Sequence, residues 1–155
     1  MNASELRHAW VSMFQPYPWQ VFLTLTFDRK RIAPSYSVLP HSADKAFRGL
    51  VLFFNQRLYG PRYRRKTKHK GVVWVRVAEA HRDGVLHFHA VLHAPSGPMP
   101  EDLIRAAEEW WKGQFGMARA EVPRSREDVL RYLTKHVGDP ERAELDFSWN
   151  LRKLE

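Results

Sequence analysis

The chain has 155 residues, the length of one ordinary domain, with 25 lysines and arginines against 17 acidic residues and a net charge of +8. Its 44% apolar and 27% charged residues are typical of a globular protein and exclude a mainly disordered chain. The absence of cysteine excludes disulfides, thiolate metal sites and a thiol nucleophile. No apolar run reaches the ~18 residues of a membrane span and no secretory signal is visible, so we expect a cytoplasmic protein. The positive charge indicates a polyanionic partner, either nucleic acid or an anionic membrane.

The order of the expected elements predicts a single α+β domain. Apolar residues at helical spacing predict helices over 3–14, 43–58 with Ser42 as the cap, 101–112 and 126–137. Runs of β-branched and aromatic residues predict strands over 19–28, 72–80, 85–92 and 118–122. Residues 138–155 follow the core, 19–137, as a terminal strand or a C-terminal arm. This order favours one central antiparallel sheet flanked by helices, a sandwich of the ferredoxin or RRM type.

Two histidines and a glutamate form the first candidate site. Residues two apart in a strand face the same side, so His87 and His89 point one way and Phe88 points into the core. A three-residue turn at 82–84 places Glu79 opposite His87 and on the same face, whereas a two-residue turn directs Glu79 away. Two imidazoles and a carboxylate suit Mn²⁺, Mg²⁺ or Zn²⁺, with positions open to a substrate oxygen. We expect this face to be open to solvent; the alternative is that the three are ordinary polar residues there.

Tyr132 is the second candidate. In a helix it shares a side with Lys135 and His136. An ammonium beside a phenol stabilises the phenolate form, which makes Tyr132 a candidate nucleophile with Lys135 as its partner. The alternative is a core tyrosine on an amphipathic helix.

A basic segment over 62–70 is the third candidate. It combines six lysines and arginines with one tyrosine and no acidic residue, which suits phosphate contacts and base stacking. The alternative is a solvated loop, and a loop that becomes ordered on nucleic acid satisfies both interpretations. The DNA-binding candidates are Arg62, Tyr63, Arg64, Arg65, Lys66, Lys68 and Lys70.

Three short motifs, taken in chain order, resemble those of the HUH endonuclease family of rolling-circle replication initiators. Residues 22–27, Phe-Leu-Thr-Leu-Thr-Phe, resemble the first motif. Residues 87–89 resemble the His-hydrophobic-His motif, and residues 132–135 resemble the Tyr-x-x-Lys motif. Glu79 lies where such proteins commonly place a third metal ligand. One tyrosine after the histidine pair is the order of single-tyrosine replication initiators.

The resemblance implies a metal-dependent, sequence-specific nuclease that nicks a plasmid or phage origin in single-stranded or hairpin DNA. It implies that Tyr132 becomes linked to the 5′ phosphate and frees a 3′ hydroxyl, with Lys135 beside it. It assigns the ion, Mn²⁺ or Mg²⁺ foremost, to Glu79, His87 and His89. Because the sequence has no Gly-x-x-x-x-Gly-Lys-Ser/Thr loop, we expect the host to supply helicase and polymerase. We expect a monomer that does not bind membranes.

Two other functions stay open at this point. A single-strand DNA transposase uses the same scaffold, but such enzymes tend to carry Tyr-x-x-x-Gln, and residue 136 here is His. A basic nucleic-acid-binding module without chemistry leaves His87 and His89 with structural roles only. His93 and His136 are accessory candidates, because His93 shares strand parity with His89 and His136 follows Tyr132 by one helical turn.

Overall fold

The computed structural model describes residues 1–28, 40–63, 71–80 and 86–153. A five-stranded antiparallel sheet in the order β4-β1-β3-β2-β5 forms its centre. The strands are β1 (Val21–Leu25), β2 (Val73–Ala80), β3 (Leu86–His93), β4 (Ala118–Glu121) and β5 (Ala143–Phe147). The helices are α1 (Ala3–Phe14), α3 (Pro40–Tyr59), α5 (Glu101–Gln114), α6 (Arg126–Leu133) and the 3-10 helix η1 (Trp149–Lys153). The predicted α+β class, with one antiparallel sheet flanked by helices, is confirmed.

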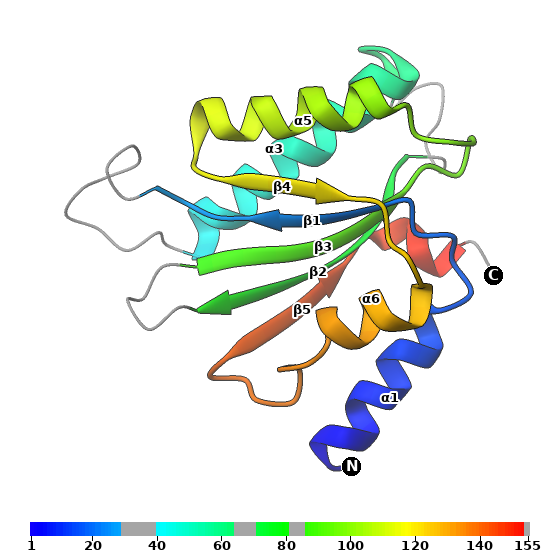
Figure 1. The fold of residues 1–155 in the computed structure, drawn as a ribbon, viewed down its shortest axis with the longest axis vertical. Helices are drawn as coiled ribbons and strands as arrows, with labels where there is room; N and C mark the ends of the chain where they lie inside the picture. The colour runs from blue at the N-terminus through cyan, green and yellow to red at the C-terminus, as the bar shows by residue number, and fades with distance from the viewer. Residues whose placement is uncertain (29–39, 64–70, 81–85, 154–155) are drawn as a thin grey trace.

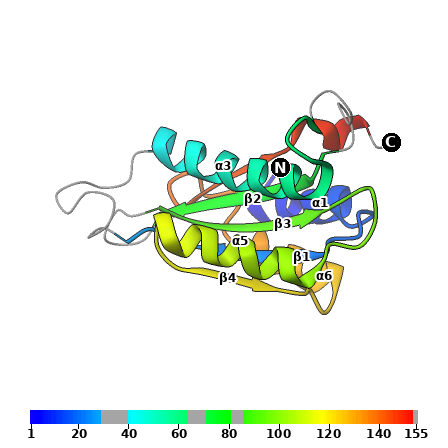
Figure 2. The ribbon, with the colours of Figure 1, turned by 90° about the horizontal axis from the view of Figure 1, so that it is seen from above.

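Two helices cover each face of the sheet. Helices α3 and α5 lie on one side, called the α3 face below, and α1 and α6 lie on the other, the α6 face (Figures 1 and 2). Because side chains alternate along a strand, the sheet supplies two separate cores. Leu23, Leu25 and Phe88 belong to the core of the α3 face, whereas Val75 and Val77 belong to that of the α6 face.

Helix α6 ends at Leu133, so the prediction that it continues to residue 137 is wrong. The hydroxyl of Thr134 donates a hydrogen bond of 2.8 Å to the carbonyl of Leu130 and closes the last turn. The chain then turns to Gly138, whose φ of +113° is in the region that favours glycine. A Cβ at Gly138 would lie only 2.9 Å from the Cβ of Ala3. Helix α1 therefore packs directly on the turn that follows α6.

Helix α3 begins earlier than expected. It starts at Pro40, so Ser42 lies inside the helix and its predicted role as the cap is wrong. A proline is tolerated in the first turn because the missing N–H has no intrahelical acceptor there.

Although α3 has 20 residues, no helix in the described part of the chain is both long and apolar enough to cross a bilayer.

The last strand is part of the sheet. Strand β5 pairs with β2 along one edge, with Leu145 opposite Val77 and Ala143 opposite Glu79. Of the two expectations for the end of the chain, a terminal strand or an arm, the strand is correct for residues 143–147. Strand β1 is shorter than predicted, since only Val21–Leu25 of residues 19–28 is extended in the sheet.

Candidate active site

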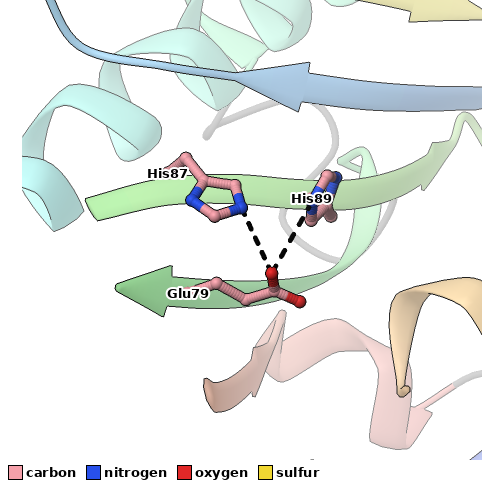
Figure 3. Close-up of side chains that lie close together, drawn as sticks. All are labelled: Glu79, His87 and His89. Atoms are coloured by element: carbon pink, nitrogen blue, oxygen red, sulfur yellow. Dashed lines mark ion pairs between the residues drawn. The ribbon is translucent and has the colours of Figure 1, made fainter. Parts of the chain in front are cut away.

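Glu79, His87 and His89 lie together on neighbouring strands. Glu79 of β2 is directly opposite His87 of β3, the register expected from a three-residue turn; the turn itself lies outside the described residues. One carboxylate oxygen of Glu79, Oε2, is 3.2 Å from Nε2 of His87 and 3.9 Å from Nε2 of His89 (Figure 3). The three side chains thus point toward one position between the strands, as the alternation of β3 predicts.

The group is buried, which corrects the expectation that it faces solvent. Glu79, His87 and His89 are 7%, 8% and 5% exposed. The expectation is wrong because α6 and β5 complete this face from distant parts of the chain. Tyr132 of α6 lies against the ring of His89, with ring centroids 5.4 Å apart. Polar side chains on a solvent-exposed sheet face are hydrogen-bonded by water. Three buried polar side chains have lost that water and require hydrogen-bond or ionic partners in its place.

The charge state of Glu79 suits a cation. Burial raises the pKa of Glu79, but the hydrogen bond from His87 and the charges of His89, His87 and His136 outweigh it, so the pKa lies below its ordinary value. The second carboxylate oxygen, Oε1, is buried without a hydrogen-bond partner among the described residues. One ligand atom from each of the three side chains lies within 4.8 Å of the others. Two imidazole nitrogens and a carboxylate oxygen could therefore hold a divalent metal ion.

Two residues of β1 hold His89 in its orientation. Thr24 is directly opposite His89 in the sheet, and its hydroxyl is 3.3 Å from Nδ1 of the imidazole. The ring of Phe22 lies parallel to that of His89, at 4° and 5.9 Å. With Nδ1 engaged by Thr24, Nε2 is the nitrogen that faces Glu79. Sequence reasoning missed both roles, although the parity of Phe22 and Thr24 within the expected strand placed them on one face.

Tyr132 is half-exposed at the edge of this group, with 47% of its surface accessible. Its ring stands edge-on to His89 and to Phe22, at 5.4 and 5.7 Å. Nζ of Lys135 lies 4.1 Å from the centre of the Tyr132 ring, in a cation–π contact. Lys135 makes this contact from the turn after α6, not from a further helical turn. The structure thus brings the tyrosine, the lysine and a candidate metal ligand together.

The two accessory histidines lie in different places. His136 is half-buried near Glu79, whose pKa it helps to lower, and its Nε2 is 3.4 Å from the guanidinium of Arg142. His93 is buried at the other end of β3, where its ring packs against Tyr17 and Trp19 at 5.9 and 5.4 Å. The structure brings His136 to the candidate site and leaves His93 away from it.

Most of the predicted basic segment lies outside the described residues. Arg62 is exposed and Tyr63 is half-buried. The remaining DNA-binding candidates, which the structure does not describe, are Arg64, Arg65, Lys66, Lys68 and Lys70. Their predicted role stays a prediction.

Comparison with known protein families gives one finding. The family of the replication-associated protein ORF2 matches residues 20–139, which include the Glu–His–His group and Tyr132. Searches of curated proteins and of solved structures gave no match to the chain.

Proposed function

We propose that this chain, which belongs to the replication-associated protein ORF2 family, nicks and rejoins single-stranded DNA at a replication origin with Tyr132 as the nucleophile. One observation carries the proposal: a half-exposed tyrosine is in ring contact with a member of a buried Glu–His–His group. The family membership supports replication initiation, and the geometry supports the chemistry. The resemblance of three motifs to the HUH endonucleases agrees with both.

The proposed reaction exchanges one phosphodiester for another. The phenolic oxygen of Tyr132 forms a bond to the scissile phosphorus, and the bond from phosphorus to the 3′ oxygen of the upstream nucleotide breaks. The phenol gives up its proton to solvent, which reaches the half-exposed side chain, and the departing 3′ oxygen takes up one proton. The products are a 5′-phosphotyrosine and a free 3′ hydroxyl. The reverse attack rejoins the strand without ATP, because the phosphotyrosine conserves the energy of the broken bond.

The protein's own side chains position the reactants. The stacked rings of His89 and Phe22 both stand perpendicular to the Tyr132 ring and restrict its rotation. Lys135 keeps a positive charge beside the ring, where it attracts the phosphate. A divalent ion held by Glu79, His87 and His89 would polarise the phosphate and offset the charge that builds on it. Because Tyr132 is on the open side of the group, the DNA strand reaches it from solvent.

The test is a search for the covalent adduct. The protein is incubated with a library of single-stranded DNA and Mn²⁺, and adducts are separated and mapped by peptide mass spectrometry. We expect a nucleotide on Tyr132, and we expect Tyr132→Phe to form no adduct while it melts at the wild-type temperature. Tyr63→Phe is the matched control, since Tyr63 is the competing tyrosine in a basic environment, and it should retain the adduct. A nucleotide on Tyr63, or binding without any adduct, would contradict the proposal.

A further inference from the structure

A hollow lies on the α3 face, on the opposite side of the sheet from Tyr132. It is a groove of about 1090 Å³ between α3 and the chain from the end of β5 into η1. Helices α3 and α6 are on opposite sides of the sheet, so the groove and the candidate active site do not share a surface (Figure 1). Its volume is slightly above the range for small-molecule sites, ~300–1000 Å³, and its walls belong to a helix and an edge strand. The groove is therefore suited to an extended ligand.

The aromatic feature of the groove is Trp149. It is 58% exposed, whereas the other five of the six tryptophans are buried or half-buried. An exposed apolar residue by itself is ordinary, but this one forms the rim of a groove whose floor includes Trp74. An accessible indole face is a stacking surface for an unpaired base of any identity.

The opposite wall carries positive charge. Lys45 and Arg48, both exposed, lie one turn apart on α3 and line the groove. Arg48 is held in place by Asp44 at 2.9 Å and by Asp146 at 3.6 Å. Lys45 and Arg48 outnumber Asp146, the acidic residue that lines the groove with them. The wall is therefore suited to a phosphate backbone running along the helix.

The ends of the basic segment lie at the same groove. Tyr63 and Gly71 both line it, and the sequence between them contains Arg64, Arg65, Lys66, Lys68 and Lys70.

The end of the groove holds an unsatisfied acceptor. The side-chain amide of Asn150 donates to the carbonyl of Gly71 at 2.9 Å, and Asn55 accepts from the backbone N–H of Val72 at 2.8 Å. These two bonds make the wall rigid. Oδ1 of Asn150 is buried without a hydrogen-bond partner among the described residues.

We propose that this groove binds a segment of single-stranded DNA, with a base stacked on Trp149 and backbone phosphates against Lys45 and Arg48. The proposal takes from the proposed function that the nucleic acid is DNA, and it adds a second contact region distinct from the site of cleavage. The strand is held on the α3 face while another part of it reaches Tyr132 on the α6 face. A single strand is required because a paired base cannot present its face to the indole.

The test measures binding of fluorescein-labelled dT oligonucleotides of about 12 nucleotides by anisotropy over a series of salt concentrations. Trp149→Ala should weaken binding by on the order of tenfold or more, the usual loss for one stacked base. Lys45→Gln should reduce the salt slope by about 0.7, one phosphate contact for a single strand. The oligonucleotide should also quench wild-type tryptophan fluorescence, and Trp149→Phe should remove most of that quenching.

Two control variants carry matched changes elsewhere. Met117→Ala removes an exposed apolar side chain, 65% accessible, and Lys112→Gln removes a lysine of α5; neither should change binding. All variants should melt at the wild-type temperature. If Trp149→Ala and Lys45→Gln bind the oligonucleotide with the wild-type affinity and the wild-type salt dependence, the groove proposal is overturned, and a protein or a small molecule becomes the expected ligand of the groove. The Tyr132 adduct is measured separately. If the adduct is absent but Trp149→Ala and Lys45→Gln weaken binding as expected, only the proposed function is contradicted. If the adduct forms but these two variants bind the oligonucleotide like the wild type, only the groove proposal is contradicted.

Discussion

Strand β2 buries one charged side chain on each face of the sheet, and their surroundings differ. On the α3 face, Arg76 pairs with Asp44 at 2.6 Å and Asp146 at 3.4 Å. On the α6 face, Glu79 meets only imidazole nitrogens, and one of its oxygens has no hydrogen-bond partner in the part of the chain that the structure describes. The guanidinium is also surrounded by the rings of Phe47, Trp74 and Phe88, at 4.9 to 5.5 Å.

The difference is between a charge that has opposite charges inside the protein and a charge that lies among possible metal ligands. Nη2 of Arg76 meets two opposite charges within the protein, which offset part of the cost of its burial, while Nε and Nη1 have no hydrogen-bond partner among the described residues. Glu79 is grouped with side chains that can offer lone pairs, and a cation is the partner that satisfies all of them. The same strand thus contributes an internal ion pair on one side of the sheet and a residue of the candidate metal site on the other.

The largest expected effect comes from three successive residues of β3 that alternate between the faces. Phe88→Ala should lower the free energy of unfolding by about 3–5 kcal/mol, because it leaves a cavity in the core of the α3 face. For a domain of this size that corresponds to a fall in Tm on the order of 10 °C. His87→Ala and His89→Ala should cost clearly less stability, and both should abolish DNA nicking. Thermal melting and the nicking assay on the same preparations decide this, and equal losses of stability at all three positions would refute the division.

Metal addition sharpens the comparison next. Mn²⁺ at about 100 times its Kd should stabilise the wild-type protein by about 2.7 kcal/mol, since it binds only the folded state. Glu79→Gln keeps the shape of the side chain but removes its charge, so this variant should show little or no rise in Tm. Arg76→Lys, on the other face, should retain the full rise. The measurement is a melting series with Mn²⁺ and with EDTA, and a metal-induced rise in Glu79→Gln would contradict the assignment.

A smaller effect is expected at Thr24. Thr24→Val keeps the shape of the side chain but removes the hydroxyl that meets Nδ1 of His89. We expect a loss of metal affinity of about tenfold, the lower end for a residue that orients a ligand. Calorimetric titration with Mn²⁺ measures it, and Thr26→Val in the same segment is the control. Unchanged affinity would show that Phe22 and the strand alone fix the imidazole.

The smallest effect concerns Asp44 on the α3 face. Burial raises the pKa of Asp44, but hydrogen bonds from Arg48 and Arg76 outweigh it and hold the pKa below its ordinary value of 3.8. Because the pKa of Asp44 is lower in the folded state than in the unfolded state, ionised Asp44 stabilises the fold at any pH above the unfolded-state pKa. This stabilisation is lost as the pH falls through the folded-state pKa. Asp44→Asn should therefore cost about 1 kcal/mol at neutral pH, a value kept small by partial exposure. The difference from wild type should shrink below about pH 4, as urea titrations at several pH values can show.

Much of the fold and of the candidate site could be predicted from patterns of neighbouring residues in the sequence. The alternation of His87, Phe88 and His89 predicted their faces, and Glu79 was expected opposite His87 only on the condition of a three-residue turn, which agrees with the observed register. These features depend on a few adjacent residues. The helix carrying Tyr132 was also predictable, but its end was not, because Thr134 can either continue a helix or cap it by bonding back to Leu130.

Features that depend on distant residues were not predictable. The burial of the Glu–His–His group requires α6 to pack on the α6 face and β5 to extend the sheet beside β2, and no local pattern specifies either arrangement. The orientation of His89 by Thr24 requires the pairing of β1 with β3, which are more than 60 residues apart in sequence. The groove beside Trp149 needs the end of β5 to return alongside α3.

The close contact between Gly138 and Ala3 joins a residue inside the stretch matched by the family to a helix outside it. Family likeness covers residues 20–139, yet α1 precedes that stretch and β5 follows it. Helix α1 rests on the turn after Tyr132, and β5 pairs along the edge of the sheet with the strand that carries Glu79. A fragment trimmed to the shared stretch would therefore expose the Glu–His–His side to water from two directions. Residues 20–139 alone thus lack two elements that contact the candidate site's surroundings, and the cooperative unit is expected to include both end segments.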